Sequence, residues 1–105
     1  MTIADPRAFI DSSMTEEEWL QQVRELARLK GWLNYHTRSS RRSDPGFPDL
    51  VLVRGERLIF AELKREKGRV TASQRTWLGA LEQTIAAEVF TWRPSDWERV
   101  EKVLT

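Results

Sequence analysis

The sequence predicts an α/β fold, in which a mixed four-stranded sheet is flanked by helices in the order α-β-β-β-α-β-α. Three observations predict it. Apolar residues recur at helical spacing in residues 15–30 and 73–87. Two apolar runs of strand length, residues 48–54 and 57–64, flank a Gly-Glu pair. Two shorter apolar runs, before and after these elements, are typical of strands.

The elements follow one another with clear boundary signals. The first helix has an apolar face and is expected to end at Gly31. That face consists of Trp19, Val23, Leu26 and Ala27. A short strand is expected over residues 32–37, then a loop over 38–47. The second helix places Trp77, Leu78, Leu81 and Ile85 on its apolar face. The strand "AEVFTW" and a last helix complete the domain, with Ser95 as N-cap and Glu98 in a capping box.

Length and composition indicate one domain of ordinary character. The 105 residues suit a single modest core, and residues 1–13, which lack periodicity, are expected to be a lead-in to a domain at 14–105. With 17 basic and 16 acidic residues the net charge is +1, so global charge indicates no partner. The absence of cysteine excludes disulfides and thiolate metal sites. Without an apolar run of about 18 residues or a secretory signal, we expect a cytoplasmic protein with no membrane contact.

The hairpin "PDLVLVRGERLIFAELK" brings two acids together. Glycine at the first central position suits a type II′ turn, which pairs Arg54 with Arg57 and therefore Asp49 with Glu62. Facing residues have Cβ atoms about 4.5–5.5 Å apart, so these carboxylates should repel each other. A divalent cation between them would offset this repulsion, because hard cations bind carboxylate oxygens.

Lys64 adds a third charge to the same end of the hairpin. It lies two residues beyond Glu62 and so leaves the same face of the sheet, while the backbone carbonyl of Leu63 could still reach a metal. Both faces of the hairpin are otherwise apolar, as expected for strands covered on two sides. The alternative is purely structural, since strand-end acids and lysines also form solvated ion pairs.

These residues belong to longer stretches that resemble a known family. "PD", twelve residues and then "ELK" look like the core of the PD-(D/E)xK nucleases. The stretches "EEEWLQQV", "YHTRSSRRSDPGFPDLVLV", "AELKREKGRVTASQRTWL" and "VFTWRPSDWERV" are similar to the VRR-NUC branch, in the small stand-alone form common in phages and prophages. The resemblance covers about residues 14–104. It implies a restriction-endonuclease-like core and a nuclease domain at residues 14–105.

The resemblance also implies roles for particular residues. Asp49 and Glu62 match the metal-binding acids, and the Leu63 carbonyl matches the usual backbone ligand. Lys64 matches the lysine that orients or activates the attacking water. Gln74 matches a glutamine at the start of the following helix. Such a site would use Mg²⁺ or Mn²⁺ to activate water and polarise a phosphoryl oxygen.

A further acid of the family comes from the first helix. Glu18 is our choice, although "EEE" leaves Glu16 and Glu17 open. Glu18 has a structural alternative, because Thr15 and Glu18 form a capping-box pattern. Gln74 stands at the same position of a second capping box, which begins at Thr71.

Basic side chains flank the candidate site on both sides in sequence. They could clamp phosphates without reading base sequence, although basic runs are commonly just solvated. The candidate DNA-contacting residues are His36, Arg38, Arg41, Arg42, Lys67 and Arg69.

The resemblance therefore implies a metal-dependent DNA endonuclease. Structured or branched DNA, such as a Holliday junction, is the substrate expected for small members, and a homodimer would present two active sites to two strands. One alternative is a binding module for DNA or a partner, with an idle site on the same fold. A subunit that recognises methylated or restriction-site DNA is a weaker one, since no added specificity domain is visible.

Overall fold

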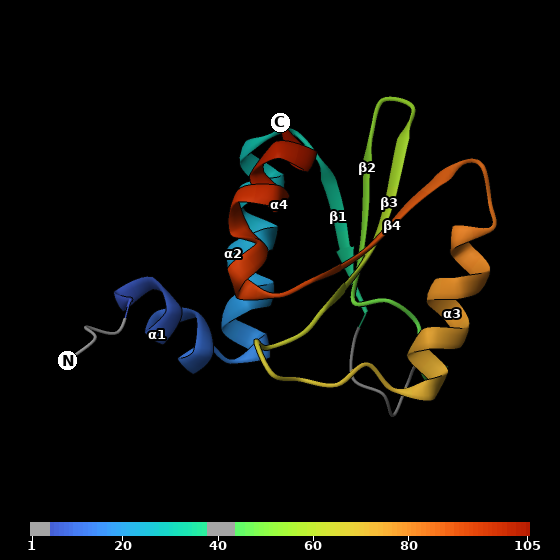
Figure 1. Ribbon diagram of the computed structural model, residues 1–105. Helices are drawn as coiled ribbons and strands as arrows, with labels where there is room; N and C mark the ends of the chain where they lie inside the picture. The colour runs from blue at the N-terminus through green and yellow to red at the C-terminus, as the bar shows by residue number, and fades with distance from the viewer. Residues whose placement is uncertain (1–4, 38–43) are drawn as a thin grey trace.

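The computed structural model describes residues 5–37 and 44–105. Within them the chain forms one four-stranded sheet with helices on both faces (Figure 1). The strands are β1 (Leu33–His36), β2 (Leu50–Arg54), β3 (Arg57–Leu63) and β4 (Ala87–Trp92), in the spatial order β1-β2-β3-β4. Strand β2 pairs antiparallel with β1 and β3, whereas β4 is parallel to β3. The predicted mixed α/β fold is confirmed.

The hairpin has the predicted register. Arg54 pairs with Arg57, and the ladder continues to Leu50 and Ala61. Gly55 has φ +59°, and no other type of residue in the described segments has a positive φ. Positive φ at the first central residue alone is the requirement of a type II′ turn. The turn therefore sets which residues meet at the far end of the hairpin.

Two helices cover one face of the sheet. They are α2 (Glu16–Leu29) and α4 (Trp97–Leu104), which lie side by side there (Figure 1). The predicted apolar face of α2 is confirmed, because Trp19, Val23 and Ala27 are buried and Leu26 packs against them. The buried strand residues below the two helices are Leu50, Leu52, Ile59, Ala61 and Leu63.

The other face of the sheet is only partly covered. Helix α3 (Ala72–Glu82) packs there through Trp77, which contacts Phe47, and Phe47 in turn contacts Phe60 of β3. Beyond the reach of α3, Leu33 and Tyr35 of β1 are 76% and 64% exposed. In the hairpin, where both faces were expected to be covered, Val53 of β2 is 39% exposed on this side, next to the exposed β1 residues.

The N-terminal lead-in contains a helix that periodicity did not indicate, α1 (Pro6–Ser13). Its start has a local cause. The side chain of Asp5 accepts a hydrogen bond from the Arg7 amide at 3.0 Å, and Pro6 occupies the first helical position. The "DPR" sequence was the available signal.

Two predicted boundaries were wrong. Helix α3 ends at Glu82, five residues early, and Ile85 is fully exposed rather than on its apolar face. The last helix is preceded by a short 3₁₀ helix, η1 (Pro94–Asp96). Asp96, not Ser95, closes this turn, because its carboxylate accepts a hydrogen bond from the Arg93 amide at 2.8 Å. Proline at the first position and an aspartate two residues on favour this tighter start.

The turn end of the hairpin is tied to the C-terminal ends of the helices. Arg54 and Arg57 both lie over the ring of Trp32, at 4.5 and 5.0 Å from its centre. Arg54 donates to the carbonyls of Lys30, Leu104 and Thr105, and Arg57 donates to that of Val103. Carbonyls at the ends of helices have no hydrogen-bond donor within the helix, so these guanidinium groups provide the missing donors.

No helix in the described ranges is long and apolar enough to cross a membrane.

Gly46 allows the loop before β2 to contact the start of α3. Its φ is +89°, and a Cβ there would lie 2.4 Å from the carbonyl carbon of Ser73. This contact sets the approach of the loop that leads to Asp49.

We predict that Gly46→Ala lowers the free energy of unfolding by about 2 kcal/mol, because alanine is strained at positive φ and its methyl group collides with backbone. Gly79→Ala is the matched control. Gly79 lies inside α3 with open space around it, so alanine should be neutral or should stabilise by up to about 1 kcal/mol. Urea unfolding measures both, and equal stability of the two variants would contradict the assigned contact.

Candidate functional site

Asp49 and Glu62 lie next to each other at the open end of the hairpin. The ladder ends at the Leu50–Ala61 pair, and Asp49 and Glu62 are the next residues beyond that pair on the two segments. The Asp49 carboxylate accepts a hydrogen bond from the Leu63 amide at 2.8 Å, and the Asp49 carbonyl accepts one from the Thr37 amide at 2.8 Å. Asp49 therefore joins β3 and the end of β1 at one point, which fixes its side chain beside Glu62.

Glu62 is a buried acid with an unusual titration. Its residue surface is 1% exposed. Burial, together with the hydrogen bond and negative charge of Asp49, raises the pKa of Glu62 from 4.5 to about 9, against the opposing charge of Lys64. A protonated Glu62 that donates to Asp49 relieves the repulsion between the two carboxyl groups. The proton thus serves in the metal-free protein where a cation was expected from the sequence.

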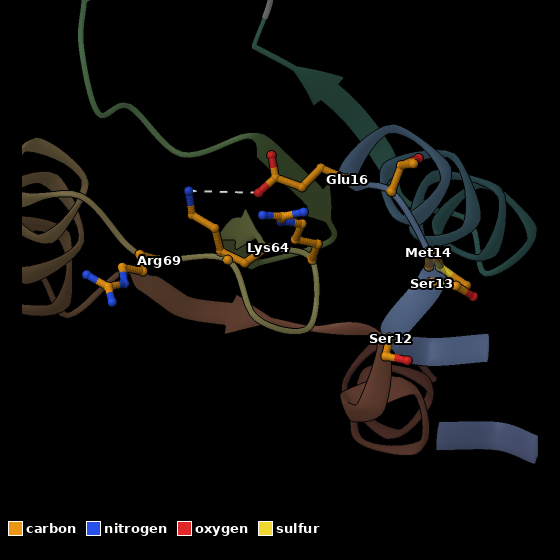
Figure 2. Close-up of a pocket in the computed structure, with 9 residues that line it drawn as sticks. Ser12, Ser13, Met14, Glu16, Lys64 and Arg69 are labelled. Carbon is orange, nitrogen blue, oxygen red and sulfur yellow. Dashed lines mark ion pairs between the residues drawn. The ribbon is translucent and has the colours of Figure 1, made fainter. Parts of the chain in front are cut away.

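Lys64 directly follows β3, two residues beyond Glu62, and it is also buried, with 8% of its surface exposed. Its Nζ lies 3.9 Å from Oε1 of Glu16, at the start of α2 (Figure 2). The backbone amide of Lys64 donates to the carbonyl of Trp92 at 3.0 Å. The same carbonyl accepts the indole N–H of Trp19 at 2.9 Å. Strand β4 and helix α2 therefore position Lys64 together.

Glu16, rather than Glu18, is the glutamate of α2 that reaches this group. Glu18 forms the capping box with Thr15, since its carboxylate accepts from the Thr15 amide at 3.0 Å. This bond lowers the pKa of Glu18, as expected for a carboxylate at a helix N-terminus. The capping alternative thus describes Glu18, and Glu16 is the glutamate of α2 that contacts Lys64.

Gln74 is likewise engaged in a capping box at the start of α3. Its side-chain oxygen accepts from the Thr71 amide at 2.8 Å. It stands close to the loop that carries Asp49, because Gly46 packs against the Ser73–Gln74 backbone. Its side-chain amide N–H group remains a possible donor to a ligand.

His36 lies at the same end of the sheet as the two acids but on the opposite face. It pairs with Leu50, the neighbour of Asp49, and alternation directs its side chain toward the α2 face. Of the basic candidates, Arg38, Arg41 and Arg42 lie outside the described residues, and Lys67 is exposed. Arg69 lines a cavity of about 390 Å³ beside Lys64, together with the end of α1 and the start of α2 (Figure 2).

The donor set suits a hard divalent cation with open coordination positions. Oε2 of Glu62 is buried and has no hydrogen-bond partner among the described residues, which is a costly arrangement that a cation would relieve. The Asp49 carboxylate lies beside it, with Oδ2 bound to the Leu63 amide. In the described part of the chain no three His, Asp or Glu side chains converge on one point. Two acids and the Leu63 carbonyl would therefore share a cation with water and substrate.

A comparison with protein families identifies the domain that carries these residues. The VRR-NUC domain model matches residues 6–93. The chain belongs to the VRR-NUC family. VRR-NUC domains have the PD-(D/E)xK type of fold, which the mixed sheet and its flanking helices reproduce. Searches of curated proteins and of solved structures gave no significant match.

Membership in the VRR-NUC family indicates the type of activity. VRR-NUC is a family of nuclease domains, and a nuclease domain implies DNA as substrate. VRR-NUC nucleases generally depend on a divalent metal. The match begins at residue 6 and so includes α1, which the sequence patterns placed in the lead-in.

Arg65 and Arg93 are two residues near the site that sequence patterns did not select. Arg65 lines the cavity beside Lys64. Arg93 donates three hydrogen bonds to the loop after β3. Adjacency to Lys64 could have suggested Arg65, whereas contacts between residues 25 to 28 positions apart leave no local signal for Arg93.

We predict that Glu62 makes the metal-free protein less stable as the pH rises. Its pKa is raised in the folded state, so between about pH 4.5 and 9 the folded chain keeps a proton that the unfolded chain has lost. Stability therefore falls with pH by up to about 1.4 kcal/mol per unit from this group. Glu62→Gln should flatten the dependence and be more stable than wild type at pH 8.

The measurement is urea unfolding in EDTA at pH 6, 7 and 8. Glu101→Gln, at an exposed position of α4, is the matched control and should keep the wild-type slope. A Glu62→Gln protein with the wild-type slope would contradict the shifted titration.

Proposed function

We propose that the chain is a metal-dependent DNA endonuclease that hydrolyses phosphodiester bonds in structured or branched DNA. One observation carries the proposal. A buried carboxyl group, Glu62, faces Asp49 next to the buried amine of Lys64, at an open end of the sheet. Burying two acids and a lysine together costs stability, so such an arrangement favours a chemical role.

Each residue has a task in this reaction. Asp49, Glu62 and the Leu63 carbonyl would hold Mg²⁺ or Mn²⁺, which supplies Lewis acidity for activating water and polarising phosphate. Lys64 would hold the attacking water by a hydrogen bond and place positive charge near the phosphoryl oxygens. The carbonyl of Trp92 keeps the Lys64 backbone in place, so the amine works from a fixed position.

Glu16 would complete the group from the side of α2. Its carboxylate lies 3.9 Å from the Lys64 amine and remains half exposed. An acid at that distance keeps the amine oriented and can accept a hydrogen bond from a water in the cavity. Glu18 lacks this freedom because it caps the helix.

DNA contacts are proposed around the same opening. Lys67 and Arg69 are exposed on the loop after β3, and the amide of Gln74 stands at the N-terminus of α3, which favours a phosphate. The loop arginines Arg38, Arg41 and Arg42 remain proposed contacts from the sequence. His36 is the weakest of the proposed contacts, since its side chain leaves the opposite face of the sheet.

A homodimer is proposed as the active form. Strand β1 is one of the two edge strands of the described sheet. Its exposed Leu33 and Tyr35, with Val53 beside them, form an apolar surface that a second copy could cover. Two copies would present two sites to the strands of a branched substrate.

The competing function is a binding module for DNA or a partner, with an idle site. A binding module would need no buried lysine beside paired acids, so the presence of all three groups favours the enzyme. The two functions give different results in a cleavage assay.

We predict cleavage of labelled flap and four-way-junction DNA in Mg²⁺ or Mn²⁺ and none in EDTA. Lys64→Ala should lower kcat by about 10²–10³-fold, because a positioned charge at the reacting centre is lost. Lys102→Ala, at an exposed position of α4, is the matched control and should cleave like wild type.

The same assay separates the two glutamates. Glu16→Gln should slow cleavage with little effect on melting temperature, whereas Glu18→Gln should lower the melting temperature and leave kcat nearly unchanged. No cleavage of any substrate with either metal, or full activity of Lys64→Ala, would falsify the enzyme proposal.

We predict a particle of twice the 12.3 kDa chain mass in light scattering. Tyr35→Lys should shift it toward a single chain, because a charge in the centre of an apolar interface is costly. Glu101→Lys, on α4, is the control for an added lysine. A single-chain mass for the wild-type protein at micromolar concentration would rule out the homodimer.

A further inference from the structure

One guanidinium group holds the loop that follows the candidate site. Nη1 of Arg93 donates to three backbone carbonyls, those of Arg65 at 2.8 Å, Glu66 at 3.2 Å and Gly68 at 2.7 Å. An arginine commonly spreads its donors over a carboxylate. Here one nitrogen lies inside a ring of carbonyl oxygens, as a bound cation would, so Arg93 closes the loop around itself.

The same corner of the chain also binds the only acid of the loop. Glu66 accepts a hydrogen bond from the Ser95 amide at 3.1 Å through its carboxylate. The loop "REKGR" therefore has its negative charge occupied at η1, while Arg65, Lys67 and Arg69 are exposed. The hydrogen bonds from Arg93 and Ser95 thus hold the loop with its acid against η1 and its three basic side chains exposed to solvent.

The loop forms one wall of the cavity of about 390 Å³ beside Lys64. Lys64 and Arg69 lie on this side, and Ser12, Ser13, Met14 and Glu16 lie on the other (Figure 2). Arg65 also lines the cavity. Glu16 is the only acid among the lining residues, and it is paired with Lys64. The remaining charge of the cavity is positive, and its volume holds an anion with several waters.

We propose that Arg93 is a positioning residue for DNA, which holds the loop 65–69 so that Arg65 and Arg69 bind a backbone phosphate in the cavity beside Lys64. The proposal rests on the proposed nuclease function and adds a phosphate subsite to it. Arg93 itself touches no substrate. It acts through the carbonyls of Arg65, Glu66 and Gly68.

The alternative role for Arg93 is a general brace of the fold. Trypsin distinguishes the two roles, because the loop contains three of its cleavage sites, Arg65, Lys67 and Arg69. If Arg93 only holds the loop, its removal should expose these three sites to trypsin and no others. If Arg93 stabilises the whole fold, its removal should also expose distant sites such as Arg28 and Lys30 at the end of α2.

The experiment compares Arg93→Ala and Arg93→Lys with Arg99→Ala. Arg99 is the matched control, because it also removes one positive charge, its side chain is 74% exposed, and it lies on α4 away from the cavity. Affinity for branched DNA is measured by fluorescence anisotropy in EDTA, where no cleavage occurs. Trypsin cleavage is mapped by mass spectrometry, and melting temperature is recorded for every variant.

Arg93→Ala should raise Kd about tenfold, which corresponds to about 1.4 kcal/mol, and should speed cleavage within residues 65–69 selectively. Arg93→Lys should restore much of both, since an ammonium group offers three donors from one nitrogen. Arg99→Ala should match wild type. The proposal is overturned if Arg93→Ala binds DNA as Arg99→Ala does, or if all tryptic sites open together.

If Arg93→Ala does not fold, Arg93→Gln takes its place, since its amide nitrogen can supply two of the three hydrogen bonds. Its Kd should then lie above that of wild type with the loop partly opened, and wild-type values in both measurements overturn the proposal. The outcome for the nuclease function is separate. If the wild-type protein binds DNA but never cleaves it, the nuclease function is refuted. The proposal that Arg93 positions the loop for phosphate binding is then still supported.

Discussion

The register of the β2–β3 hairpin is the constraint on which the site depends. Gly55, at positive φ, forms the two-residue turn that pairs Arg54 with Arg57, and this register brings Asp49 beside Glu62. Two carboxyl groups held this closely in a buried place cannot both be ionised without compensation, so Glu62 retains a proton to neutral pH and above. A slip of one residue would send one acid to each face and remove the site.

Short-range rules explain why so much of this could be predicted. Turn type, alternation along a strand and capping pairs each depend on residues a few positions apart, so they can be read directly from the sequence. The hairpin, its register, the apolar face of α2 and the mixed sheet follow from such rules. Membership in the VRR-NUC family agrees with the same fold.

Contacts between distant segments could not be obtained in this way. Glu16 and Glu18 are alike in the sequence, and only the path of α2 past β3 brings Glu16 to Lys64 while Glu18 caps the helix. The bonds from Arg93 to the loop after β3 depend on where β4 ends. The start of η1 at Pro94 was also missed, because a serine and an aspartate there offered two possible caps.

The two ends of the hairpin differ in role: the turn end stabilises the fold, and the other end holds the candidate site. At the turn, Arg54 and Arg57 enclose Trp32 and bind the last carbonyls of α2 and α4, so the cohesion of the domain is concentrated there. The opposite end holds the acids. A substrate can therefore rearrange charge and water at one end of the molecule while the other keeps the layers together. In such a design the chemistry can change by a few side chains without the architecture being rebuilt.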